Sequence, residues 1–307
     1  IMFDFFTKVY ILNKNLISHV ALFFANFIYA LNYTFAKDVM PDYIGPSGFI
    51  LLRVLGASIV FFIIYVFFIK EKVTIKDLLK IAICSMFGVA INQLFFFHGL
   101  NLSTPINAAI IMTVNPIIVV VLSYFILREI ITFKKIIGIL LAMIGALILI
   151  LQTGDMSINV STRFGNLLVL INASSYALYL VLVRPLMKKY HPITIMFFVF
   201  MFGLVFVTPF GYYELSNVIW KKIPSFILFE IVFVVFCTTV LAYLCNTTAL
   251  KYLSASTVST YIYLQPILAT IFAVLMKSDV LSYEKFFSAI LIFIGVYLVS
   301  ISPLQKR

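Results

Sequence analysis

Long apolar runs alternate with short polar joints along the whole chain. A helix needs about 20 apolar residues to cross the hydrocarbon core of a bilayer, so runs of that length predict transmembrane helices. Such runs do not suit the strands of a membrane barrel, which alternate in polarity and need only about ten residues. The pattern predicts ten spans, at about 16–36, 48–69, 78–100, 105–127, 133–151, 164–185, 193–213, 225–249, 255–276 and 283–302.

The same pattern occurs twice, with an offset of 150 residues. The stretch "NPIIVVVLSYFILREIITFKKIIGILLAMIG", which begins at Asn115, runs without a gap beside "QPILATIFAVLMKSDVLSYEKFFSAILIFIG", which begins at Gln265. Nearer the start, "YAL" at 29–31 recurs at 176–178. Each copy holds five predicted spans, which is an odd number, so the second copy enters the membrane from the opposite side. Repeats of this inverted kind are a signature of secondary transporters.

The predicted fold is therefore an all-α integral membrane protein with ten transmembrane helices in two five-helix inverted-topology repeats. The first repeat is expected to cover residues 16–151, with spans 1–5, and the second residues 164–302, with spans 6–10. The first run, from 16 to 35, is longer than the apolar part of a signal peptide. We therefore expect it to be a retained span.

Composition and charge support a membrane protein. Hydrophobic residues make up 64% of the chain and charged residues 11%, against about half and a quarter in soluble domains. The net charge of +11 comes from short basic clusters between apolar runs, which favours contact with lipid headgroups over nucleic acid. With the N-terminus in the cytoplasm, fifteen Lys and Arg fall in inner segments and six in outer ones. The positive-inside rule then predicts both termini in the cytoplasm. We expect the membrane to be the inner membrane of a bacterium.

Polar side chains within the spans are the best candidates for a binding site, because the bilayer makes them costly without partners. They form helical stripes in spans 1, 3, 4, 6, 8 and 9, whereas spans 5 and 10 are nearly free of them. Hydrogen bonds between helices are one explanation, but they give little reason to spare one helix in each repeat. A central cavity for a small uncharged or zwitterionic substrate is the interpretation we favour. Its candidate residues are Tyr29, Asn32, Arg53, Gln93, Asn115, Tyr176, Tyr179, Tyr243, Thr260 and Gln265.

We expect several charged residues in or near the spans to lie at the membrane interface or in contact with water. Arg53 is the only basic residue well inside a span, and we expect it to extend toward the interface, with an anchor for a substrate carboxylate as the alternative. Glu129 and Asp279 are expected to form interfacial ion pairs or to stay hydrated, and Glu230 to be hydrated. No carboxylate sits deep in a predicted span, so the sequence gives no support to a sodium or proton site built from buried Asp or Glu.

Small residues and prolines recur at matched positions of the two halves. Gly138 and Gly145 in span 5 match Ser288 and Gly295 in span 10, which predicts tight packing between these spans. Pro116 and Pro266 each interrupt a span. We expect a kink at both prolines, either fixed or flexing, and the amide residue before each could bond the freed carbonyls.

A set of residues in the first half forms a motif: "NAA" at 107–109, Pro116, "REIIT" at 128–132, Gly138 and Gly145. It resembles the EamA domain, which occurs twice in members of the drug/metabolite transporter superfamily, and the resemblance covers nearly the whole chain. In the second half, Asp279 stands where a Glu is usual and Ser288 replaces the Gly. The resemblance implies ten helices, two inverted repeats, a central cavity and export of small metabolites such as amino acids.

We therefore predict a secondary transporter that exports a small metabolite by alternating access. The chain contains no HExxH, GxSxG or P-loop motif, and its three cysteines have no CxxC spacing, so no catalytic residue, metal site or cofactor is predicted. A membrane-embedded enzyme remains an alternative, although no nucleophile–base pair is visible. A membrane scaffold without flux is the other.

Overall fold

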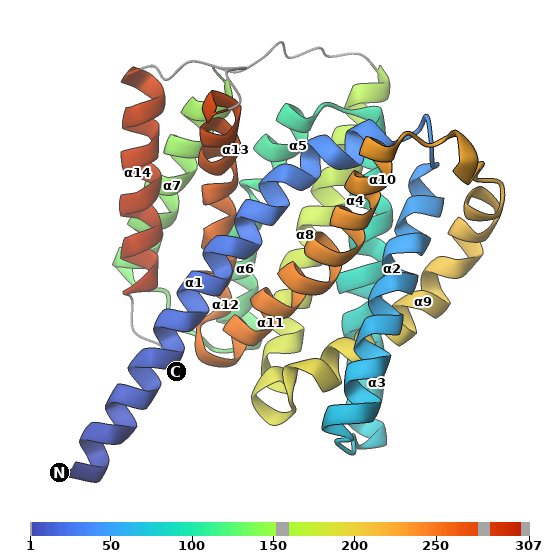
Figure 1. Cartoon of the computed structure of the whole chain (residues 1–307). Coiled ribbons are helices and arrows are strands. Elements are labelled where there is room, and N and C mark those ends of the chain that lie inside the picture. The colour runs from blue at the N-terminus through green and yellow to red at the C-terminus, as the bar shows by residue number, and fades with distance from the viewer. Residues whose placement is uncertain (1, 152–159, 276–282, 302–307) are drawn as a thin grey trace.

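The computed structural model describes residues 2–151, 160–275 and 283–301, and this part of the chain is built from helices (Figure 1). The elements of the first half are α1 (Met2–Val39), α2 (Pro46–Ile64), the π-helical turn η1 (Tyr65–Ile69), α3 (Ile75–Ser85), the π-helical η2 (Met86–Ile91), α4 (Asn92–Leu102), α5 (Pro105–Met112), α6 (Asn115–Ile126) and α7 (Phe133–Leu151).

The second half contains the remaining elements. Its elements are α8 (Val160–Lys189), α9 (Pro192–Ser216), the short 3₁₀ turn η3 (Trp220–Lys222), α10 (Ser225–Phe233), the π-helical η4 (Val234–Leu241), α11 (Ala242–Tyr252), α12 (Ala255–Thr260), the 3₁₀ turn η5 (Tyr261–Tyr263), α13 (Leu264–Leu275) and α14 (Tyr283–Ser300).

Seven helical stretches in the described part are long and apolar enough to cross a bilayer, which identifies a multi-pass membrane protein. They are 14–39, 46–69, 75–102, 107–126, 161–189, 192–216 and 225–252, and they coincide with predicted spans 1–4 and 6–8 to within a few residues. The other three predicted spans fall on α7, on α12 to α13 and on α14, with residues 276 and 302 outside the described part.

Local signals set where the helices begin. Proline occupies the first turn of α2, α5 and α9, where its missing N–H costs nothing. The Thr104 hydroxyl caps α5 by accepting from the backbone N–H of Asn107 at 3.1 Å. The Ser254 hydroxyl caps α12 in the same way, accepting from Thr257 N–H at 2.9 Å. Such caps satisfy N–H groups that have no partner within the helix.

The two interrupted spans differ from the expectation in detail. The span around Pro116 is divided into α5 and α6 by a turn at Thr113, and Pro116 lies in the first turn of α6. Pro266 lies likewise in the first turn of α13, after η5. The side-chain amides of the preceding residues, Asn115 and Gln265, do not bond the carbonyls that the prolines leave free. Asn115 Nδ2 donates to Ala173 O at 2.7 Å, and Gln265 Nε2 donates across to α1.

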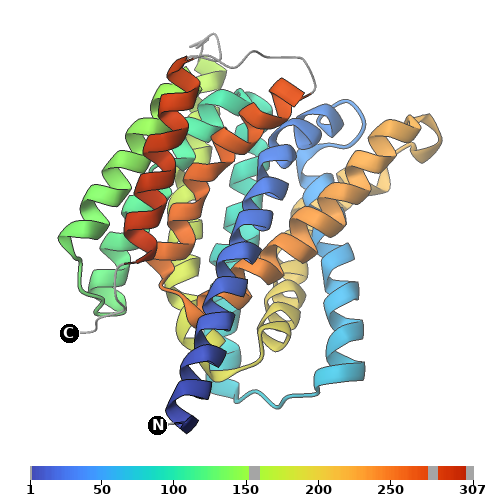
Figure 2. The same cartoon turned by 60° about the vertical axis from the view of Figure 1, so that its left-hand side comes forward.

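Two helix pairs form opposite sides of the molecule, α7 with α14 and α2 with α9 (Figure 1). The α7–α14 pair is very close: a Cβ at Gly138 would lie 2.7 Å from the carbonyl oxygen of Gly295. This is the tight packing of spans 5 and 10 that the small residues predict. Helices α1, α4, α8 and α11 lie between the two pairs, and the first turn of α1 lies at the same end as the last turn of α14 in both views (Figure 2).

Candidate functional site

A cavity lies between the central helices, with an empty volume, mouth included, of about 680 Å³. Elements from both halves of the chain contribute to it, whereas no described residue of α7 or α14 does. The lining residues are Asn26, Tyr29, Asn32, Tyr33, Arg53, Asn92, Gln93, Phe96, Phe97, Met112, Asn172, Tyr176, Thr238, Tyr243, Asn246, Val258, Ile262 and Gln265.

Seven of the ten candidate residues line this cavity. They are Tyr29, Asn32, Arg53, Gln93, Tyr176, Tyr243 and Gln265. The structure thus brings together side chains from spans 1, 2, 3, 6, 8 and 9.

The other three candidates lie outside the cavity, because each faces a neighbouring helix or its own backbone. Asn115 is fully buried and bonded to the carbonyl of Ala173 on α8. The Thr260 hydroxyl donates to the backbone of its own helix, at Ser256 O. The ring of Tyr179 packs in the space that Gly88 leaves open and is 1% exposed.

Sequence reasoning missed several lining residues. Asn26 and Tyr33 lie on the face of α1 that carries Tyr29, at spacings of three and four residues, so extending that stripe would have found them. Asn172 and Asn246 belong to polar stripes visible in the sequence. The apolar members carry no signal of their own in a chain this rich in apolar residues; they are Phe96, Phe97, Met112, Val258 and Ile262.

Hydrogen bonds connect the lining across the two halves. Gln265 Nε2 donates to Asn26 Oδ1 at 2.9 Å, and the Tyr33 hydroxyl donates to Gln265 Oε1 at 3.3 Å. On another side, Asn246 Nδ2 donates to the Tyr29 hydroxyl at 3.2 Å. These contacts orient the amides, so the cavity presents donors and acceptors in fixed positions.

Gln93 and Tyr243 form a further contact between the halves. Gln93 Nε2 donates to the Tyr243 hydroxyl at 3.4 Å. That hydroxyl lies 3.1 Å from both Gly88 O and Asn92 Oδ1, the two acceptors available to its single proton. The contact links α4 to α11 directly beside the cavity.

Arg53 does not extend to the interface, so that expectation is wrong. Its side chain is 2% exposed, and its Nε donates to Thr239 Oγ1 at 2.9 Å. The guanidinium carbon lies 4.4 Å from the ring centroid of Phe97, a cation–π contact. Helix packing from α4 and η4 covers the side chain and holds its head at the cavity.

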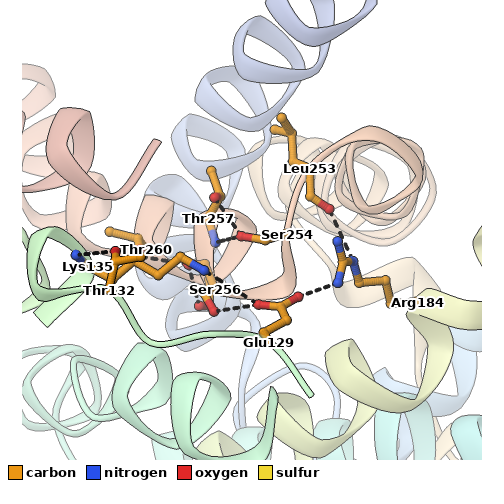
Figure 3. Close-up of polar contacts among 10 residues, drawn as sticks. Glu129, Thr132, Lys135, Arg184, Leu253, Ser254, Ser256, Thr257 and Thr260 are labelled. Carbon is orange, nitrogen blue, oxygen red and sulfur yellow. Dashed lines mark hydrogen bonds and ion pairs between the residues drawn. The ribbon is translucent and has the colours of Figure 1, made fainter. Parts of the chain in front are cut away.

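A cluster of charged and polar side chains lies where α6, α7, α8 and α12 approach one another (Figure 3). Glu129 Oε1 accepts from Arg184 Nη1, and Glu129 Oε2 lies 3.7 Å from Lys135 Nζ. Ser256 Oγ donates to the same carboxylate at 3.3 Å, and Arg184 Nε donates to Leu253 O at 3.2 Å. We call these residues, Glu129, Lys135, Arg184, Leu253 and Ser256, the Glu129 cluster.

The burial of this cluster corrects part of the sequence interpretation. Glu129 does form ion pairs, but it is not hydrated, because it is 3% exposed. Glu230, also expected to be hydrated, is fully buried in α10. Asp279 lies outside the described residues. Among those described, no three His, Cys, Asp or Glu side chains come together as a metal site would require.

Comparison with known proteins identifies the family. The model of the EamA-like transporter family matches residues 16–151 and again residues 163–301. The chain belongs to the EamA-like transporter family. This confirms the resemblance that the sequence motif indicates, and it makes the protein a membrane transporter.

Relatives of this EamA-like transporter occur in distant organisms. The uncharacterized transporter YyaM of Bacillus subtilis is 28% identical over 84% of this chain and 85% of its own length. YetK of the same species, also an uncharacterized transporter, is 26% identical over 83% and 78%. The WAT1-related protein At3g53210 of Arabidopsis thaliana is 23% identical over 88% and 79%. A protein of known crystal structure shares the fold, with a TM-score of 0.73 and 18% identity over 93% of this chain and 96% of that one.

Proposed function

We propose that this EamA-like transporter exports a small metabolite across the inner membrane of a bacterium by alternating access. The observation that carries the proposal is the cavity itself. It lies between helices of both halves and is lined by amides, tyrosines and one arginine, the few convergent polar groups that a small-molecule site has. Binding near the middle of the bundle is where secondary transporters hold their substrates.

The proposal includes ten spans in two inverted repeats, 16–151 and 164–302. Contacts between residues 150 positions apart support this arrangement. Gln93 bonds Tyr243, and the Tyr263 hydroxyl donates to Thr113 O at 2.9 Å. Equivalent residues of two repeats meet in this way only close to the axis that relates them. The matched caps at Thr104 and Ser254 and the matched π-helical turns η2 and η4 fit the same symmetry.

Alternating access needs contacts that close one end of the cavity and then release. The Glu129 cluster is suited to this role, because it joins the end of α8 to α12 and to the joint before α7 (Figure 3). That joint lies at the end of the molecule where α1 begins (Figures 1 and 2). With both termini in the cytoplasm, the cluster closes the cytoplasmic end.

Flux in liposomes tests the function. Purified protein is reconstituted and counterflow of radiolabelled amino acids and other small metabolites is measured, with empty liposomes as the control. We expect saturable counterflow of at least one compound. A scaffold would give none at any concentration, and an embedded enzyme would convert the compound rather than move it.

A reporter fusion tests the orientation. A reporter active only in the cytoplasm should work when it is fused after Lys135, and it should be silent between α7 and α8. The opposite result would place the termini and the Glu129 cluster on the outer side.

A further inference from the structure

The lining of the cavity holds one charged side chain, Arg53, among the described residues. An arginine keeps its proton in proteins, so the cavity carries a fixed positive charge. The ion pairs seen between described residues are those of Asp77 and of Glu129, and Arg53 takes part in neither. A buried charge without an opposite charge is unfavourable, and proteins retain one where a ligand supplies the partner.

The contacts of Arg53 orient its head without neutralising it. The Thr239 hydroxyl accepts from Arg53 Nε and itself donates to Val234 O at 2.9 Å, so the hydroxyl is fixed as an acceptor. The ring of Phe97 lies against the guanidinium. Arg53 Nη1 is buried and has no hydrogen-bond partner among the described residues. A donor on a positively charged group is therefore available for an anion.

Unpartnered acceptors occur in the same lining. Asn32 Oδ1, Gln93 Oε1 and Asn172 Oδ1 are buried and have no partner among the described residues. The direction of two of these amides is fixed by their nitrogens: Asn172 Nδ2 donates to Asn92 O at 2.7 Å, and Gln93 Nε2 donates to Tyr243. Their oxygens therefore need hydrogen-bond donors from whatever fills the cavity.

We infer that Arg53 is the anchor for a carboxylate, and that the ligand is a small organic acid carrying amino or hydroxyl donors for the amide oxygens. A carboxylate matches a guanidinium in shape and charge. The aromatic rings of Tyr29, Tyr33, Phe96 and Tyr176 line the same cavity and offer an apolar surface to the rest of the ligand. The inference rests on the proposed transport function and deepens it by naming the class of substrate.

Thermal unfolding of the purified protein tests the inference. The probes are the twenty L-amino acids and L-lactate, each paired with its carboxamide, in buffer of constant chloride concentration. At least one acid should raise the unfolding temperature of the wild type by several degrees, because a ligand that binds only the folded state stabilises it. Its carboxamide should give no shift. Arg53→Gln should weaken the affinity for the acid about 10- to 100-fold, and Arg53→Lys should retain part of it.

Two controls accompany this test, one in a second variant and one in the unliganded Arg53→Gln protein. Arg163→Gln changes an exposed arginine outside the cavity and should bind the acid like the wild type. The unliganded Arg53→Gln protein should unfold at no lower temperature than the wild type, because it loses no ion pair.

The possible outcomes separate the anchor from the transport function. Equal shifts of the unfolding temperature with acids and carboxamides, or an undiminished shift in Arg53→Gln, would overturn the anchor while leaving transport intact. If no compound of the panel shifts the unfolding temperature, the ligand is not a small organic acid of this kind. If a chloride titration reproduces the shift, the site binds an inorganic anion instead. Loss of all liposome flux, measured separately, would overturn the transport function.

Discussion

Arg53 and Arg184 are two arginines with nearly the same burial and opposite surroundings. Each is almost fully inaccessible, at 2% and 3% exposure. Arg184 binds the carboxylate of Glu129 and the carbonyl of Leu253, whereas Arg53 has a hydroxyl, an aromatic ring and a free Nη1. The protein balances one charge internally and leaves the other unbalanced at a cavity. Burial alone therefore does not distinguish a structural charge from a binding charge; the partners do.

The largest expected effect comes from removing the carboxylate of Glu129, which Arg184 and Lys135 share. Glu129→Gln leaves Arg184 and Lys135 as buried cations without an anion. Breaking a buried pair in this way costs about 3–5 kcal/mol, so the variant should unfold at much lower temperature or denaturant concentration. Equilibrium unfolding in detergent measures this. The double variant Glu129→Gln with Arg184→Gln should recover part of the loss, and strict additivity of the two changes would show that the pair is not coupled.

The two arginines should respond differently to the same substitution. Arg184→Met leaves Glu129 with Lys135 alone and should destabilise the protein by about 2–4 kcal/mol. Arg53→Met removes a charge that no carboxylate balances, so the free energy of unfolding should stay the same or rise. Both variants are compared in one unfolding series. If Arg53→Met is as destabilising as Arg184→Met, a partner within the protein supports Arg53, and the contrast between the two sites fails.

Cavity substitutions should affect flux more than stability. Gln265→Ala removes an amide that connects Asn26 and Tyr33, and Tyr243→Phe removes the hydroxyl that Gln93 contacts. A lost hydrogen bond to a neutral group is worth about 1 kcal/mol, so unfolding should shift by an amount of that order, well below the effect of Glu129→Gln. Counterflow should fall several-fold, because the amide and the hydroxyl orient the lining of the cavity. Flux is compared at equal amounts of reconstituted protein. Unchanged flux in both variants would mean that these polar residues only hold helices together.

The contrast between the two arginines also shows what the sequence could reveal. Apolar run lengths are local properties, so the seven spans found in the described part of the chain are predicted to within a few residues. The stripes identify a polar face, and with it Tyr29, Tyr176 and Tyr243. The Glu129–Arg184 pair joins residues 55 positions apart, and the pair forms only when the helices pack. A single sequence therefore indicates that the two charges exist but not that they meet.

The same limit explains why three candidates lie outside the cavity. Asn115, Tyr179 and Thr260 carry the residue types of a binding site, and their spans do reach the cavity. Whether a side chain points to the cavity or to the next helix depends on a helix rotation that periodicity alone does not fix. Arg53 illustrates the converse. Its position near the outer end of a span suggests the interface, but the neighbouring α4 and η4 enclose it.

The smallest expected effect comes from Tyr179→Phe, and it separates the cavity from its surroundings. Tyr179 lies on α8 one turn from Tyr176, and their rings stack with centroids 6.0 Å apart, but only Tyr176 lines the cavity. The Tyr179 hydroxyl is buried without a partner among the described residues, so removing it breaks no recorded hydrogen bond. The free energy of unfolding should therefore stay the same or rise slightly, and counterflow should remain within about twofold of the wild type because a difference under about 0.4 kcal/mol is expected. Tyr176→Phe is the matched variant on the cavity side and should reduce flux more. A larger loss of flux in Tyr179→Phe than in Tyr176→Phe would show that the transported molecule contacts Tyr179. Tyr179 would then belong to the binding site and not to the packing around it.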